Sequence, residues 1–178
     1  MKYLSLLFAL PLLFSGCDKI KQVSFNSEFS VTFAVNETSA GTNLPYFEME
    51  AINLADDPDL EPYINDIKEI TIKSISYKIE NYSGAEDISF EGEIGFSKIN
   101  AAAPELFSST SPVLLFEKNQ ETTKTLLDFD SNATNRIRDI LLSEKAIRVY
   151  ADGLMSHGPA SFDLKVYVFA TITAETEE

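Results

Sequence analysis

The sequence predicts an all-β protein, a single antiparallel β-sandwich of about eight strands with two short helices. Several segments alternate strictly between apolar and polar residues, which is typical of strands with one buried face. The chain is rich in aromatic residues, with 13 Phe and 7 Tyr, which favour strands. Turn residues recur between the short apolar runs, a spacing that favours a sandwich over βαβ units. With 178 residues, 44% hydrophobic and 24% charged, the chain has the composition of one folded domain.

The first two strands are predicted on either side of a turn-rich stretch, "NETSAGTNLP". Before it, residues 25–35 alternate with the period of a strand, and residues 46–54, "YFEMEAINL", follow it as the second strand. In the first strand the residues of one parity are Phe25, Phe29, Val31, Phe33 and Val35. In the second strand Phe47, Met49 and Ala51 share one face.

A short helix and a long strand are expected next. Residues 55–67 contain Pro62, which is tolerated only in the first turn of a helix, so the helix is expected to start near Asp59 with Asp57 or Asp59 as its cap. Residues 68–82 form the strand, and its apolar parity changes at Lys73–Ser74, which indicates a β-bulge or two buried faces. "SGAED" is predicted as a hairpin loop before a strand at 88–96, whose apolar residues are Ile88, Phe90, Ile94 and Phe96.

The second half of the chain is predicted in the same way. Residues 97–112 are expected to be a loop, since they contain Pro104 and Pro112, and strands follow at 113–117 and 122–129 around a "KNQE" turn. Residues 130–143 form the second helix, capped by Asp130 or Asn132. Strands at 145–153 and 160–173 flank a hairpin turn, and 174–178 is an acidic tail. The helix is expected to bury Ile137, Ile140 and Leu141.

A weak internal similarity relates the stretch from Leu54 to Tyr77 to the stretch from Leu127 to Tyr150. Both read as loop, short helix, strand and hairpin. Either the domain contains a duplication, or two helix-to-strand corners use the same capping chemistry.

The first residues form a leader of a recognisable kind. Lys2 is followed by an apolar run from Tyr3 to Phe14, which is shorter than the roughly 20 residues of a membrane-spanning helix. It matches the apolar region of a signal peptide, and small residues follow it, as signal peptidases require. "LFSGC" resembles the lipobox of bacterial lipoproteins, with Phe14 where that family prefers Leu. The single cysteine of the chain, Cys17, stands at the position that this family lipidates.

The resemblance implies a covalent anchor at the N-terminus. Diacylglycerol would be joined to the Cys17 thiol, residues 1–16 would be removed, and the new amino group would carry a further acyl chain such as palmitate. Residues 17–24 would then be a lipidated tether, and 25–173 the β-sandwich domain. The protein would sit in the cell envelope, on the periplasmic or surface face of the outer membrane. The domain also loosely resembles small envelope lipoproteins, a likeness that implies no activity.

Charge and residue counts exclude several kinds of function. A formal net charge of −14 repels phosphate backbones, so nucleic acid is not an expected partner. The one histidine, His157, lies in a turn sequence without a G-x-S-x-G motif, which does not indicate a nucleophilic triad. With Cys17 committed to lipid, no zinc site can be built from His and Cys. The sequence therefore predicts no catalytic, cofactor-binding or metal site.

The expected function is that of a non-enzymatic binding or structural module. Its partners would be the membrane, through the covalent lipid, and an envelope protein or a glycan. Two alternatives remain open. Paired carboxylates could serve a small carbohydrate-active hydrolase, with Tyr46, Tyr63 and Tyr82 stacking on sugars. Calcium could stabilise an adhesion domain at one of two acidic runs, Asp56-Asp57-Asp59-Glu61 or Asp128-Asp130-Asn132-Asp139.

Overall fold

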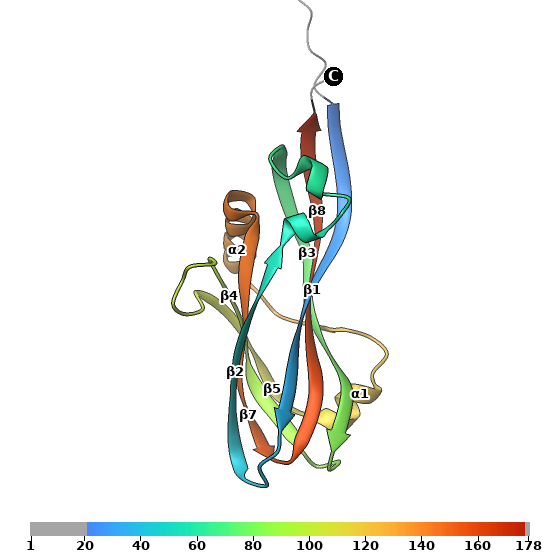
Figure 1. Ribbon diagram of the computed structural model, residues 1–178, viewed down its shortest axis with the longest axis vertical. Coiled ribbons are helices and arrows are strands. Elements are labelled where there is room, and N and C mark those ends of the chain that lie inside the picture. Colours follow the sequence, from blue (N-terminus) through green and yellow to red (C-terminus); the bar gives the residue numbers. More distant parts are fainter. Residues whose placement is uncertain (1–20, 177–178) are drawn as a thin grey trace, which may run out of the picture.

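The computed structural model describes residues 21–176, which fold into two packed antiparallel sheets (Figure 1). Sheet A has the order β1-β8-β3-β6 and sheet B the order β2-β7-β4-β5, so the predicted all-β sandwich is confirmed. The strands of sheet A are β1 (Lys21–Glu37), β8 (Ala160–Thr176), β3 (Ile67–Gly84) and β6 (Thr125–Leu126). Those of sheet B are β2 (Thr42–Asn53), β7 (Ala146–His157), β4 (Ser89–Ser97) and β5 (Leu106–Leu114).

The core lies between the sheets and is built from the alternation that the sequence shows. In β1 the odd-numbered residues point into the core, as the alternation predicts, and Phe29, Val31, Phe33 and Val35 are buried. In β8 every second residue from Ala160 to Ala174 is buried. Strand β3 changes register between Ile72 and Ser74, so the predicted β-bulge is confirmed at the position where the parity changes.

The predicted hairpins are wrong, because the chain crosses from one sheet to the other after most strands. "SGAED" leads from β3 in sheet A to β4 in sheet B, and Gly158–Pro159 leads from β7 in sheet B to β8 in sheet A. Among the described strands, only β4 and β5 are both consecutive and paired. Local turn residues mark where the chain reverses, but they do not specify which sheet receives it.

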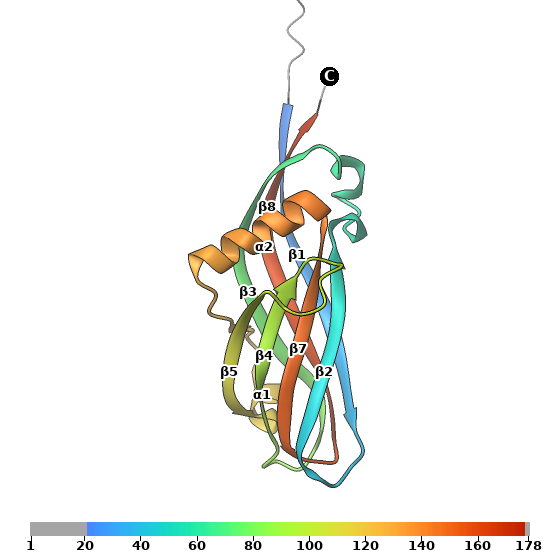
Figure 2. The ribbon, with the colours of Figure 1, turned by 90° about the vertical axis from the view of Figure 1, so that its left-hand side faces the viewer.

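The second predicted helix is confirmed and the first is not. Helix α2 (Ser131–Glu144) begins after the cap Asp130, whose Oδ1 accepts the Ala133 N–H at 2.7 Å. It buries the expected Ile137, Ile140 and Leu141 at one open side of the sandwich (Figure 2). In place of the helix predicted at 55–67 there are two single 3₁₀ turns, Leu54–Asp56 and Glu61–Tyr63, because Pro58 and Pro62 leave no uninterrupted stretch for a longer helix.

Two further segments differ from their predictions. Residues 106–112, expected in a loop, form most of β5, where Pro112 is tolerated because β5 is an edge strand. The predicted strand at 113–117 becomes the end of β5 and the start of α1 (Leu115–Gln120). The predicted strand at 122–129 pairs only over β6, so the rest of that segment lies outside the sheets.

The domain reaches further toward both ends than expected. Residues 21–24, assigned to the tether, pair with residues 173–176 of β8, part of which was assigned to the acidic tail. The Glu175 N–H also donates to the Asp66 C=O at 3.0 Å. At these ends the strands are paired through their backbones. The prediction relied on alternating apolar residues and therefore ended the strands too early.

Candidate functional site

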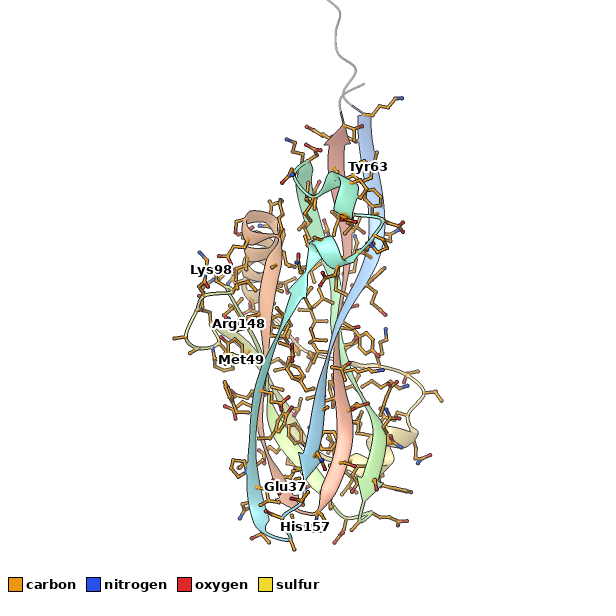
Figure 3. The ribbon with its side chains drawn as sticks, in the orientation of Figure 1. Glu37, Met49, Tyr63, Lys98, Arg148 and His157 are labelled. Carbon is orange, nitrogen blue, oxygen red and sulfur yellow. The ribbon has the colours of Figure 1, made fainter. Side chains whose placement is uncertain are left out.

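The predicted lipidation site, Cys17, lies outside the described residues. The described chain begins at Lys21 and ends at Thr176, and these two residues face each other at one end of sheet A (Figure 1). At the opposite end lie Glu37 and His157 (Figure 3). In residues 21–176, no helix is long and apolar enough to cross a membrane.

The outer face of sheet B combines exposed apolar side chains with carboxylates. Figure 2 shows the four strands of this sheet side by side, in the order β2-β7-β4-β5. Their register places side chains in rows, since residues directly opposite one another point to the same side of a sheet. The outward rows are Pro45, Leu154 and Glu91; Phe47, Asp152, Glu93 and Ser109; Met49, Tyr150, Gly95 and Phe107; and Ala51, Arg148 and Ser97.

Three neighbouring apolar side chains on this face stand in solvent. Phe47 is 51% exposed, Met49 50% and Leu154 49%. Phe47 and Met49 are two residues apart on one face of β2, and Leu154 lies on β7 opposite Pro45, diagonal to Phe47 and two rows from Met49. We call Phe47, Met49 and Leu154 the sheet B patch. Figure 3 shows Met49 on the outer side of sheet B, away from the core.

Beside the patch, a loop closes over the upper part of the face. Tyr150 points outward yet is only 1% exposed, and its ring lies 6.0 Å from that of Phe47. Its hydroxyl donates to the Ala101 C=O at 3.2 Å and accepts from Ser97 Oγ at 3.2 Å. Arg148 donates to the same carbonyl at 3.1 Å. The loop residues 98–104 therefore rest on Tyr150 and leave the patch itself uncovered.

Three exposed carboxylates flank the sheet B patch. Asp152 lies opposite Phe47 on one side and opposite Glu93 on the other, and Glu91 lies opposite Leu154. We call Glu91, Glu93 and Asp152 the acidic cluster. Within residues 21–176 no ion pair involves any of them, and the one side-chain contact is from Ser109 Oγ to Glu93 at 3.1 Å. Like charges directly opposite one another destabilise a sheet, so the pair Asp152 and Glu93 lowers the stability of the folded domain.

Strand β2 also breaks the usual pattern of an edge strand. Ile52 and the half-buried Tyr46 show that its even-numbered residues face the core, yet Glu48 and Glu50 occupy the same parity and are exposed. The Tyr46 hydroxyl donates to Glu48 at 2.8 Å, and burial together with this contact raises the pKa of Tyr46. Inward-pointing charges on an edge strand discourage its pairing with the edge strand of another molecule, which explains the presence of Glu48 and Glu50. It does not explain why Phe47 and Met49 point outward.

The single histidine joins two segments at the end of the sandwich far from the termini. His157 is the last residue of β7, and its Nε2 lies 3.3 Å from Asp87 Oδ1 while its Nδ1 lies 3.0 Å from Ser156 Oγ. The Ser89 N–H donates to the same serine oxygen at 3.0 Å. Sequence reasoning missed this group, because Asp87 and His157 are far apart in the chain. The Asp87 side chain is 80% exposed, so the contacts form a surface link between segments.

Three residues of the two acidic runs considered for calcium make contacts within the protein. Asp130 caps α2, and Asp139 accepts from Arg138 at 2.7 Å. Asp57 Oδ1 accepts the Asp59 N–H at 2.9 Å. In the described part of the chain no group of three or more His, Cys, Asp or Glu residues could hold a metal ion.

The residues considered for a hydrolase also have structural contacts. A groove of about 330 Å³ between β1 and the first 3₁₀ turn is lined in part by Glu28, Asp56 and Asp57. Glu28 forms an ion pair with Lys124, and Asp57 makes the contact described above. The Tyr63 ring packs on Phe25 at 5.2 Å, and the Tyr82 hydroxyl donates to the Ala85 C=O. The three tyrosines come from three different elements, Tyr46 from β2, Tyr63 from the second 3₁₀ turn and Tyr82 from β3.

Comparison with known proteins gives only distant structural likenesses. No protein-family model and no curated protein matches this chain. The decameric BFDV capsid protein superposes with a TM-score of 0.39 at 12% identity, over 86% of this chain and 99% of that one. A Desmodium yellow mottle tymovirus chain gives a TM-score of 0.30 at 10% identity, over 100% and 95%. Both scores are low, so the description of the fold rests on the strand pairing of this chain.

Proposed function

We propose that this chain is a lipid-anchored protein of the bacterial cell envelope that acts as a non-enzymatic binding module. The observation that carries the binding role is the sheet B patch, where Met49, Phe47 and Leu154 occupy three successive rows of one face and are each about half exposed. Contiguous exposed apolar side chains with a polar border are typical of interaction surfaces. The anchor is supported by the lipobox-like sequence that ends at Cys17.

Acyl chains at Cys17 would be a sufficient anchor by themselves. Each buried methylene contributes about 0.8 kcal/mol, and two or three chains hold a protein on a bilayer where a single chain holds it only marginally. The strongly acidic domain would be repelled by anionic headgroups, so attachment falls to the lipid. We assign the protein to the outer membrane, on its periplasmic or surface face.

The position of the termini supports an upright arrangement. Because Cys17 precedes β1 by only a few residues, the end that holds Lys21 and Thr176 would face the bilayer. The end with Glu37 and His157 would point away, roughly 50 Å farther out, since β1 has 17 residues at about 3.3 Å each. The sheet B patch would then lie on the side of the molecule, open to a partner that approaches parallel to the membrane.

The anchor is tested by growing cells with a labelled fatty acid. The wild-type protein should take up the label and fractionate with membranes, whereas Cys17→Ala should do neither. Mass spectrometry of the wild type should show a terminus that begins at an acylated Cys17. An intact leader, or an unmodified terminus released into the medium, would contradict the proposal.

The binding role is tested by affinity capture from detergent-solubilised envelope. The wild-type protein should retain a stoichiometric partner or glycan that the double variant Phe47→Ser/Met49→Ser loses. Leu126→Ser is the matched control, because Leu126 is 72% exposed on β6, in the other sheet. If no component binds at micromolar concentrations, or if the control loses it equally, the sheet B patch is not a binding surface.

A further inference from the structure

We propose that the sheet B patch and the acidic cluster together bind a cationic amphipathic segment of a partner protein. This inference rests on the proposed binding function and specifies the chemistry of its partner. Apolar side chains of the segment would cover Phe47, Met49 and Leu154, while its Lys or Arg residues would pair with Glu91, Glu93 and Asp152.

The first argument is proximity. Phe47, Asp152 and Glu93 lie in one row across β2, β7 and β4, and neighbouring strands are about 4.8 Å apart. Along β2, Phe47 and Met49 lie about 7 Å apart, close to the spacing of residues on one side of a helix or a strand. An amphipathic segment lying along the strands can therefore contact the patch with one side and the cluster with the adjacent side.

The second argument is charge. Asp152 and Glu93 lie opposite each other without an ion pair, and among the described residues Ser109 provides the only side-chain hydrogen bond to the pair. Two cations in this part of sheet B have other partners, since Arg148 donates to the Ala101 C=O and Lys98 lies 4.0 Å from Glu144. A basic partner would neutralise a repulsion that the domain leaves uncompensated.

A second copy of this chain fits the surface less well. Two copies, each with a formal net charge of −14, repel one another, and face-to-face contact would bring two acidic clusters together. A neutral glycan would leave the same carboxylates unneutralised. The aliphatic Met49 and Leu154 also lack the flat rings on which sugars stack, and the chain has no Trp.

The test measures binding of a defined probe to the full-length mature protein in neutral detergent micelles. The probe is a fluorescent helical peptide with leucines along one side and lysines along the adjacent side. We expect micromolar binding that weakens as salt is added. Replacing the lysines by glutamates, or the leucines by serines, should abolish it.

Variants of the protein separate local recognition from general attraction. Glu93→Lys/Asp152→Lys should weaken binding about tenfold or more, as should Phe47→Ser/Met49→Ser. Glu86→Lys/Glu117→Lys changes the net charge by the same amount at exposed sites away from this face and should change binding less than about twofold. Thermal unfolding of each variant checks that the domain remains folded.

Several outcomes would overturn the inference. Equal loss in the charge-matched control would mean that only the net charge attracts the peptide. Binding of a neutral oligosaccharide, self-association or calcium binding, lost in Phe47→Ser/Met49→Ser while the peptide fails to bind, would assign the face to another ligand. In those cases the binding function proposed above would stand and only the cationic partner would be wrong.

Discussion

The outer faces of the two sheets differ in whether their charged side chains form ion pairs. On sheet A, Glu80 lies between two lysines, 2.9 Å from Lys78 and 2.7 Å from Lys165, and Lys124 pairs with Glu28 while covering the Tyr167 ring at 3.7 Å. On sheet B, the acidic cluster forms no ion pair within the described residues, and the side chains of the sheet B patch are about half exposed. The outer face of sheet A therefore neutralises its own charges, whereas the proposed function gives that role on sheet B to a partner.

The largest expected difference between the faces concerns their tyrosines. Tyr150 on sheet B is fully buried under residues 98–104 with two hydrogen bonds, whereas Tyr167 on sheet A is only partly buried. We expect Tyr150→Ala to lower the free energy of unfolding by about 3–5 kcal/mol and Tyr167→Ala by about 1 kcal/mol or less. Urea denaturation measures both. Equal losses would mean that residues 98–104 do not seal this part of sheet B.

The carboxylate of Glu80 should stabilise the fold in a pH-dependent way. Hydrogen bonds from Lys165 and Lys78 lower its pKa from 4.5 to about 2. A lowered folded-state pKa gives stability that is present above the unfolded pKa and is lost as the pH falls through the folded one. We expect Glu80→Gln to lower the free energy of unfolding by about 1 kcal/mol at neutral pH, after allowing for solvent screening.

The pH profile of that variant provides the check. The difference between wild type and Glu80→Gln should be constant above about pH 5 and should vanish as the pH approaches about 2. Glu86→Gln, in an exposed turn, serves as the control and should follow the wild type. A difference that is independent of pH would exclude the ion pairs as its source.

Removing a carboxylate from sheet B should raise the free energy of unfolding, whereas removing Glu80 from sheet A should lower it. Asp152→Asn relieves the repulsion from Glu93, so we expect the free energy of unfolding to rise by about 0.5 kcal/mol at low salt. Salt screens exposed charges, so the gain should shrink at high ionic strength. Loss of stability in Asp152→Asn would show that the domain itself compensates the cluster.

The smallest effect is expected for the sheet B patch. Phe47→Ser and Met49→Ser remove side chains that are already half exposed, so each should change the free energy of unfolding by less than about 0.5 kcal/mol. Phe33→Ser, at a fully buried position of β1, is the contrasting variant and should cost several times more. If the patch variants destabilise the domain as strongly, its exposed residues serve folding rather than binding.

Features encoded by neighbouring residues were predicted well. The cap Asp130 and the spacing of Ile137, Ile140 and Leu141 specify α2, because capping and helical periodicity act within a few residues. The parity change near Ser74 likewise located the bulge in β3. The serine-rich strand β5 was missed, since Leu106 and Ser108 face inward together and give no apolar alternation.

The candidate site depends on contacts that no local pattern contains. Phe47 and Met49 were expected to share a face, but Tyr46 and Ile52 alternate equally well on the other parity, so β2 alone does not show which side is buried. The acidic cluster exists because β4 pairs with β7, two strands separated by β5, α1, β6 and α2 in the chain. The exposed Glu48 and Glu50 on the inward parity were the one available signal that β2 is unusual.

The position of β8 has a consequence for folding and for the export that the proposed function requires. This last strand lies between β1 and β3 and pairs with both along most of its length, so sheet A has no continuous hydrogen-bonded structure without it. Assembly therefore waits for contacts between residues at opposite ends of the chain, which are slow to form. A polypeptide threaded through a translocation pore from its N-terminus would stay unfolded, as passage requires, until its C-terminal strand has followed.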